Sequence, residues 1–259
     1  MNTIQAFILG LLQGITEFLP ISSTGHLYLG RHLFGLDEAG LFLDTMLHFG
    51  TLIAILVFYK EEILMILRRP FCRLSLLLIV GTIPAVVFGL LFKDFFDTLS
   101  KSGVTIGWEF LITGGMMWFA ETLKPGRKKM NELTVTDALF IGCFQASAIF
   151  PAISRSGSTI VASLIRKLDR ETAAYFSFLL STPAIAGAVA LQCKDLFEGT
   201  AQQISLPSLL IATLTSAFFG YLAIRWMIGF VKKQSLKLFA VYVWALGIII
   251  LVAQWTGRF

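Results

Sequence analysis

Two short polar stretches interrupt an otherwise strongly apolar chain, and the first carries residues suited to acid–base chemistry. It is FLPISSTGH at residues 18–26, preceded by Gln13 and Glu17. These two residues are four apart, so a helix would place both side chains on one face, and Pro20 would end that helix. A return helix would then begin with Ser22, Ser23, Thr24 and His26. The free amides and the dipole of a helix start favour an anion such as phosphate.

The second polar stretch is FPAISRSGST at residues 150–159, and it contains a cation but no carboxylate. The planar guanidinium of Arg155 matches phosphate oxygens, and Gly157 permits close backbone approach. Hydroxyl groups flank Arg155 at Ser154, Ser156, Ser158 and Thr159. One stretch therefore offers an acid–base or metal-binding group and the other a phosphate clamp, which is the division of roles that phosphoryl transfer requires.

Structural explanations stay open for several of these side chains. Serine and threonine at a helix break commonly cap the next helix, and Gln13 would equally serve as a hydrogen bond between helices. Ionisable residues at membrane depth tend to mark function, but Glu17 and Arg155 would also satisfy each other as a purely structural ion pair.

Four further ionisable residues lie in apolar segments outside the two stretches. Asp44 and His48 form another pair spaced by four residues, with either a structural role or a place at a substrate entrance. Glu109 and Glu121 lie near the ends of an apolar segment, and we expect both at the membrane interface.

The composition predicts an integral membrane protein. Of 259 residues, 56% are hydrophobic and 14% are charged, and the apolar stretches reach about twenty residues, the length that spans a bilayer. The N-terminus has neither a basic leader region nor a cleavage site, so we expect it to be retained. Cys72, Cys143 and Cys193 lack ligand spacing and are expected to be small apolar fillers, with no disulfide or zinc site.

The two halves of the chain resemble each other. A shift of 132 residues aligns Gly10 to Gln13 with Gly142 to Gln145, Ser22 with Ser154, Gly25 with Gly157, and Ala54 with Ala186. We therefore predict one all-α membrane domain over 1–259, with repeat halves at approximately 1–130 and 131–259.

Each half is predicted to contain a re-entrant helical hairpin followed by three transmembrane helices. A polar turn cannot face lipid, so each hairpin must be buried in protein or line a wet cavity. The predicted spans are 41–59, 74–92, 104–122, 172–190, 207–230 and 236–256. Because three spans are an odd number, the halves would have opposite orientations, which is an inverted-topology repeat.

The basic residues indicate the orientation of these spans. Fourteen of the 21 Lys and Arg residues lie in 60–73, 124–133, 166–171 and 232–237. Since cytoplasmic loops carry an excess of Lys and Arg, we expect these four segments on the cytoplasmic side and the loop 192–206 outside. The net charge of +5 thus indicates membrane orientation, and no nucleic-acid partner is expected.

The motifs QGITEFLPISSTGH at 13–26 and PAISRSGST at 151–159 resemble the two signature motifs of the undecaprenyl-diphosphatase family, which is associated with bacitracin resistance. The resemblance extends over essentially the whole chain. Two departures are Ala152, where the family usually has Gly, and Gln13, where Glu also occurs. Ala152 would tighten the turn, and Gln13 would weaken metal binding.

The resemblance implies a multi-pass enzyme of the bacterial inner membrane that converts undecaprenyl diphosphate to the monophosphate at the outer face, which recycles the lipid carrier of wall synthesis. It implies dependence on Mg²⁺ or Ca²⁺, and Glu17, with Gln13, would bind the metal or act as the base. The diphosphate would be held by Arg155 and by the hydroxyls of Ser22, Thr24, Ser154, Ser156 and Thr159. His26 would transfer a proton, and Ser23 is a candidate nucleophile, with direct attack by water left open.

The partners implied are the polyprenyl diphosphate and membrane lipids, and a homodimer is possible. Inverted repeats with broken helices also build secondary transporters, so a carrier or flippase for a polyprenyl phosphate is the alternative. A structural membrane subunit would leave the ionisable residues of the two stretches unexplained.

Overall fold

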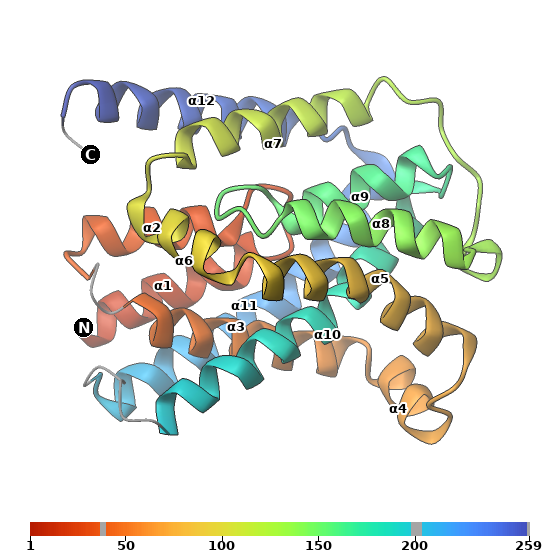
Figure 1. Ribbon diagram of the computed structural model, residues 1–259, viewed down its shortest axis with the longest axis horizontal. Coiled ribbons are helices and arrows are strands. Elements are labelled where there is room, and N and C mark those ends of the chain that lie inside the picture. Colours follow the sequence, from red (N-terminus) through yellow and green to blue (C-terminus); the bar gives the residue numbers. More distant parts are fainter. Residues whose placement is uncertain (37–39, 198–203, 258–259) are drawn as a thin grey trace.

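The computed structural model describes residues 1–36, 40–197 and 204–257, and the regular elements among them are helices (Figure 1). The first half contains α1 (Thr3–Thr16), α2 (Ser23–Leu33), α3 (Gly40–Phe58), α4 (Lys60–Arg68), α5 (Arg73–Leu91), α6 (Lys93–Ser102) and α7 (Ile106–Ala120). The second contains a 3₁₀ turn (Met130–Glu132), α8 (Val135–Ser147), α9 (Arg155–Ile165), α10 (Arg170–Phe197), α11 (Leu206–Lys233) and α12 (Lys237–Trp255).

Four helices are long and apolar enough to cross a membrane, namely α5, α10, α11 and α12. They confirm the spans predicted at 74–92, 172–190, 207–230 and 236–256. The span predicted at 41–59 corresponds to α3, which forms one arm of a bent pair with α4, at an angle of 81°.

The span predicted at 104–122 is shorter in the structure. It corresponds to α7, which has 15 residues and would extend about 22 Å. Gly103 has a positive φ just before the helix. At the other end, Glu121 accepts hydrogen bonds from Arg170 and from the backbone of Leu236. Because hydropathy does not report such tertiary contacts, the sequence predicted a longer helix than the structure contains.

Both predicted helix breaks are present, and serine caps the return helix in each. The Ser22 hydroxyl accepts a hydrogen bond from the Gly25 amide at 3.4 Å, and the Ser154 hydroxyl accepts one from the Gly157 amide at 3.1 Å. The pairs α1–α2 and α8–α9 each pack together as a hairpin. Serine capping therefore accounts for one of the structural roles left open by the sequence.

Corresponding helices of the two halves pack in corresponding ways. Helix α1 packs on α11, and α8 packs on α5. At the first crossing, a Cβ added to Gly10 would lie 2.5 Å from the carbonyl oxygen of Ala212, and at the second a Cβ added to Gly142 would meet the backbone of Gly81 even more closely. Since Gly10 and Gly142 are 132 residues apart, both close crossings depend on glycine at matching positions.

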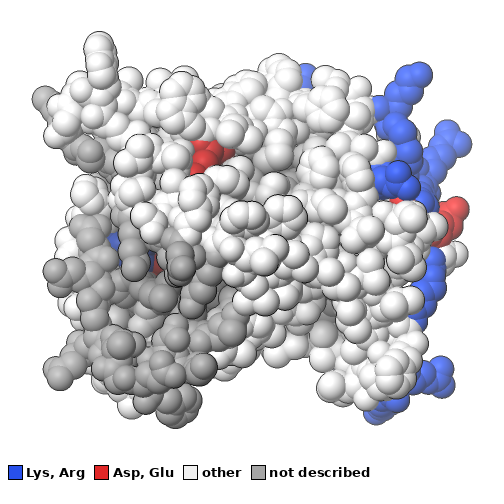
Figure 2. Space-filling view, viewed as in Figure 1, with Lys and Arg blue, Asp and Glu red and all other residues white. Residues whose placement is uncertain are grey.

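Charge is segregated along the molecule. Most of the Lys and Arg visible in Figure 2 lie at the end where Figure 1 places α4 and the connection from α7 to α8, whereas both termini lie at the opposite end. We call the first of these the basic end. Large apolar side chains such as Leu76, Ile79 and Ile83 on α5 are about half exposed between the two ends, as expected for a surface in contact with lipid.

A buried carboxylate organises the basic end. Asp137, in the first turn of α8, accepts from Arg166 at 2.6 Å and from the Thr134 hydroxyl at 2.7 Å, and it also pairs with Lys128. Burial opposes ionisation of Asp137, but the hydrogen bonds from Lys128, Thr134 and Arg166 outweigh it and hold its pKa well below the usual range. This cluster connects α8, α9 and the segment that precedes α8.

Candidate active site

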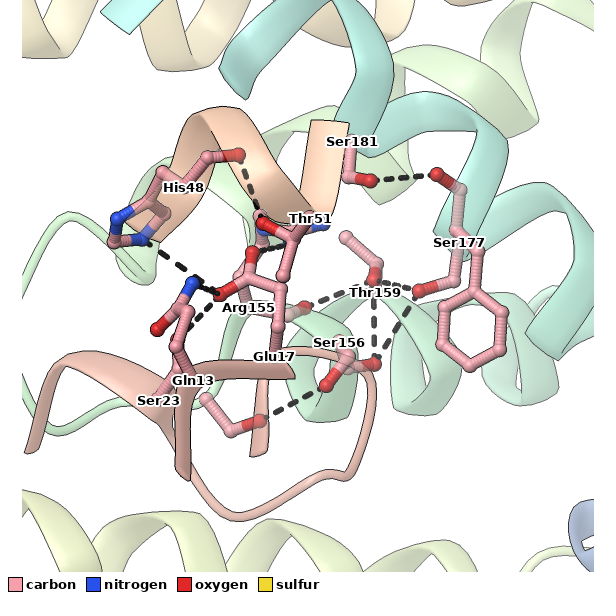
Figure 3. Close-up of polar contacts among 12 residues, drawn as sticks. Gln13, Glu17, Ser23, His48, Thr51, Arg155, Ser156, Thr159, Ser177 and Ser181 are labelled. Carbon is pink, nitrogen blue, oxygen red and sulfur yellow. Dashed lines mark hydrogen bonds and ion pairs between the residues drawn. The ribbon is translucent and has the colours of Figure 1, made fainter. Parts of the chain in front are cut away.

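The tips of the two hairpins meet at the carboxylate of Glu17, which follows the last residue of α1 and is buried (Figure 3). Its Oε2 accepts from Gln13 Nε2 at 2.9 Å and from Ser23 Oγ at 2.5 Å. Its Oε1 accepts from a terminal nitrogen of Arg155, the first residue of α9. The structure thus brings Gln13, Glu17, Ser23 and Arg155 together.

Two polar atoms in this cluster have no partner. Arg155 Nη1 and Gln13 Oε1 are buried, and neither forms a hydrogen bond with a described residue. A buried polar atom without a partner is unfavourable by about 1–3 kcal/mol, so such atoms point to a ligand. The site therefore retains one guanidinium donor for an anion and one amide acceptor for a hydroxyl, a water or a cation.

His48 on α3 is a member of the site whose role the sequence left open. Its Nε2 lies 3.7 Å from Glu17 Oε2, and its Nδ1 donates to the carbonyl of Asp44 at 2.7 Å. The Asp44 side chain instead pairs with Arg31 at 2.7 Å. The i, i+4 spacing thus indicated a real contact, in which the Asp44 backbone orients the His48 ring toward Glu17.

His26 faces away from these bonds, toward α12. Its Nδ1 lies 2.6 Å from the carbonyl oxygen of Ser22, which can only accept, so Nδ1 carries the proton. Its Nε2 then accepts from the Tyr242 hydroxyl at 2.8 Å, and the two rings are stacked. None of its hydrogen bonds with described residues reaches Glu17 or Arg155. Nothing in the sequence pattern indicated Tyr242 as its partner.

The two tips are tied by reciprocal hydrogen bonds. The Ser22 hydroxyl donates to the carbonyl of Pro151 at 3.0 Å, and the Ser156 hydroxyl donates to the carbonyl of Leu19 at 2.9 Å. The acceptors Leu19 and Pro151 are 132 residues apart, whereas the donors Ser22 and Ser156 are 134 apart, so the two bonds follow the repeat only approximately. These bonds fix the approach of one tip to the other, and with it the pairing of Glu17 and Arg155.

The remaining hydroxyls predicted to bind substrate differ in whether they already have hydrogen-bond partners in the protein. The Ser154 hydroxyl lies 3.3 Å from that of Ser156, and Thr159 bonds to the Arg155 carbonyl and, at 2.5 Å, to Ser177 on α10. Thr24 is partly exposed, and its hydroxyl forms no hydrogen bond with a described residue. Thr24 and the partly exposed Ser23 are therefore the hydroxyls most open to an incoming group.

Ser22 has an unusual backbone conformation. Its φ is 67°, which residues other than glycine rarely adopt. The bonds from Ser22 to Pro151 and from His26 to Ser22 hold it there, and the next residue, Ser23, points at Glu17. Strain of this kind is typical of functional sites, where surrounding contacts maintain it.

Glu109, which was expected at the membrane interface, is buried inside the protein, with 3% of its surface exposed. Its Oε2 accepts from the Ala152 amide and its Oε1 accepts from the Thr105 hydroxyl, both at 2.5 Å. Thr113, one turn later on α7, donates to the Ala152 carbonyl at 3.1 Å. Helix α7 thus satisfies the backbone of the second turn, and Ala152 adopts an ordinary negative φ that does not require glycine.

The donor atoms fit a hard cation only if substrate oxygens complete its coordination. Gln13 Oε1, the Glu17 carboxylate and Ser23 Oγ are oxygen donors of the type that Mg²⁺ and Ca²⁺ prefer. Among the described residues, no group of three or more His, Cys, Asp or Glu side chains is placed to hold a metal ion. The side chain of Cys193 lies outside the described residues; Cys72 is partly buried and Cys143 is exposed, both as free thiols.

Comparison with known proteins gives full-length matches. The chain is 67% identical over 259 residues to a Bacillus cereus protein named undecaprenyl-diphosphatase 3, and equally to a Bacillus thuringiensis protein named undecaprenyl-diphosphatase 4, with 100% of each chain covered. It is 49% identical over 261 residues to the undecaprenyl-diphosphatase of Carboxydothermus hydrogenoformans, again with complete coverage. Residues 6–249 match the family described as bacitracin resistance protein BacA. Because that match includes both hairpins and the helices that support them, this chain belongs to the BacA family.

Proposed function

We propose that this multi-pass membrane protein hydrolyses undecaprenyl diphosphate to undecaprenyl phosphate and inorganic phosphate. Its full-length relatives are named for that substrate. The observation that carries the proposal is the convergence of Ser23 and Arg155 on the Glu17 carboxylate from two separate hairpins. A hydroxyl, a base and a guanidinium donor are the groups needed to activate a nucleophile and to bind a phosphate.

Arg155 is the proposed diphosphate anchor. Its unpaired Nη1 would donate to a phosphate oxygen while Nη2 stays on Glu17. The backbone amides at the start of α2 and α9, with the Thr24 hydroxyl, would contribute further donors. The other predicted ligands, Ser22, Ser154, Ser156 and Thr159, would keep the tips in place in this arrangement, since their hydroxyls already have protein partners.

Ser23 is the proposed nucleophile, and its 2.5 Å hydrogen bond to Glu17 supports this role. Glu17 would accept the Ser23 proton as Oγ bonds to the terminal phosphorus. The bond from that phosphorus to the bridging oxygen would break, and undecaprenyl phosphate would leave. Water would then cleave the phosphoserine, releasing inorganic phosphate and restoring the hydroxyl. In the alternative route Glu17 activates water directly, and Ser23 only orients the carboxylate.

A divalent cation and proton transfer by His26, both implied by the family resemblance, are also part of the proposed mechanism. A divalent cation would be held by Glu17 and Gln13 together with substrate oxygens, and when bound it would neutralise phosphate charge. His26 remains a predicted proton-transfer residue. Its bonds to Ser22 and Tyr242 additionally support a positioning role, since they hold the residue that precedes Ser23.

The proposed orientation puts the basic end in the cytoplasm of a bacterium, with the site open to the outer face of the inner membrane. The concentration of Lys and Arg at that end supports it. The matching helix crossings of the two halves support an inverted-topology repeat in which the hairpins enter from opposite sides.

Phosphate release from purified protein in detergent tests the proposal. Wild type should release phosphate from undecaprenyl diphosphate, less so with a chelator. Glu17→Gln should abolish release while the protein stays folded in detergent at the assay temperature, although loss of the buried partner of Arg155 lowers its unfolding midpoint. Ser23→Ala should be inactive if Ser23 is the nucleophile and should retain partial activity if water attacks directly. Transfer of the lipid between leaflets without phosphate release would support the carrier alternative instead.

A further inference from the structure

Arg225 is a charged side chain on the exposed surface of a spanning helix. It lies within Leu206–Lys233, a segment long and apolar enough to cross a membrane, and no described residue forms a hydrogen bond or ion pair with it. It is eight residues, or about 12 Å, from the end of α11 at Lys233. A guanidinium at this depth is unfavourable unless it reaches water or an anion. The long side chain allows it to extend toward the basic end.

A groove beside Arg225 runs along the same helix. Arg225, Gly229 and Lys233 recur at intervals of four residues and therefore lie on one face, and Trp226 and Phe230 line the groove with them. The rings of Trp226 and Phe230 are 4.9 Å apart. A Cβ added to Gly229 would find no atom within 4 Å. The space between the two cations is thus open.

The groove carries positive charge that no described residue neutralises. None of the described residues that line it is acidic. Glu171, the acid paired with the neighbouring Lys232 at 2.7 Å, is already engaged. Trp226 is 52% exposed, and tryptophan favours the boundary between headgroups and hydrocarbon. Two free cations beside an interfacial aromatic ring match an anion that is itself attached to hydrocarbon.

We propose that this groove binds an anionic phospholipid from the leaflet at the basic end. The Arg225 fork and the Lys233 ammonium would hold the phosphodiester, and the open position at Gly229 would admit the lipid backbone between them. Because α11 also packs against α1, which positions Gln13 and Glu17, the bound lipid would stabilise the helix that supports the catalytic hairpin.

Lipid selectivity measures this site directly. Native mass spectrometry and thermal unfolding would compare phosphatidylglycerol with phosphatidylcholine for wild type, for Arg225→Gln/Lys233→Gln and for the control Lys124→Gln/Arg127→Gln. The control removes the same charge from exposed positions at the same end. We expect wild type and control to retain phosphatidylglycerol preferentially, and the groove variant to lose the preference by about fivefold for each cation removed. Equal losses in both double variants would overturn the proposal, because net charge alone would then explain retention.

Gly229→Leu provides a second test that leaves both cations in place. The open space at Gly229 allows the protein to fold with the larger side chain, which would fill the groove, and we expect the preference to fall. An undiminished preference in Gly229→Leu would contradict a groove site. Inorganic phosphate at the same phosphate concentration should affect wild type and the Arg225→Gln/Lys233→Gln variant equally, since both keep the Arg155 site. Stabilisation by inorganic phosphate that is lost in the groove variant would mean that the groove holds a free anion and no lipid.

Discussion

The Arg155 guanidinium both neutralises Glu17 and keeps one terminal nitrogen unpaired. This fork geometry predicts that charge alone is not sufficient for function. Arg155→Lys keeps the charge but loses the second donor direction, so we expect kcat to fall about 10²–10³-fold, as when a preorganised donor is removed from an active site. The change should appear mainly in kcat, because the lipid tail still anchors the substrate in the membrane.

Steady-state phosphate release from undecaprenyl diphosphate in micelles measures this effect. Arg127→Lys is the matched control, since Arg127 is exposed at the basic end and lies outside the site. Activity of Arg155→Lys within a few-fold of wild type would mean that Arg155 acts only as a positive charge. Substantial activity of Arg155→Ala would place the phosphate elsewhere.

The site was partly predictable from residue types alone. The spacing of Gln13 and Glu17 and the unfavourable burial of charge at Glu17 and Arg155 were sufficient to predict that these side chains lie together. Tyr242 was not predictable, because its partner His26 is 216 residues away and a half-exposed tyrosine in an apolar helix has no distinguishing pattern. His48 was partly predictable. Its spacing of four residues from Asp44 indicated a contact between them, but nothing in the sequence indicated that this face of α3 turns toward Glu17.

At the scale of the elements, α7 supports the second hairpin through Glu109. In Glu109→Gln, one of the two donors at Thr105 and Ala152 would face an amide NH₂ group, so we expect a loss of about 1–3 kcal/mol in stability and a lower kcat. Glu61→Gln, at an exposed position on α4, is the control for loss of a carboxylate. Unfolding midpoints and kcat that match between the two variants would exclude a positioning role for Glu109.

The Asp137 cluster predicts a pH-dependent stability of the basic end. The pKa of Asp137 is lowered in the folded protein, so the stability that its carboxylate contributes is fully present above the ordinary carboxyl pKa of about 4. That stability is lost as the pH falls toward the lowered pKa of the folded protein. Asp137→Asn should lower the unfolding midpoint at pH 7 and remove much of the further decrease between about pH 4 and pH 2. An unchanged acid dependence in Asp137→Asn would assign that decrease to other carboxylates.

The sequence predicted the elements where local chemistry decides them. Proline and serine marked both hairpins, and apolar length marked α5, α10, α11 and α12. No proline or glycine marks the bend between α3 and α4 at Tyr59, and α7 ends at Glu121, which pairs with Arg170 from a distant part of the chain. The short helices α4 and α6 were not predicted, because their amphipathic patterns are too brief to distinguish from loops.

At the scale of the whole molecule, the charge distribution predicts which end each loop occupies. In a background without native cysteines, Arg127→Cys should react with a membrane-impermeant thiol reagent only after permeabilisation, whereas Thr256→Cys, near the opposite end, should react in intact cells. The reverse labelling pattern would invert the proposed topology. The loop 192–206, predicted to lie outside, is largely beyond the described residues and is not used as a probe.

The pairing of Glu17 with Arg155 also has a consequence for biosynthesis. The two residues are separated by 138 positions, so a nascent chain places Glu17 in the membrane well before its counter-charge has left the ribosome. During that interval the first hairpin holds a carboxylate that is unstable in lipid, and it has no phosphate anchor. With Arg155 as the proposed phosphate anchor, we expect the enzyme to become active only when the second hairpin inserts. Fragments truncated before residue 155 are expected to be unstable and degraded by membrane proteases rather than to accumulate as partial enzymes.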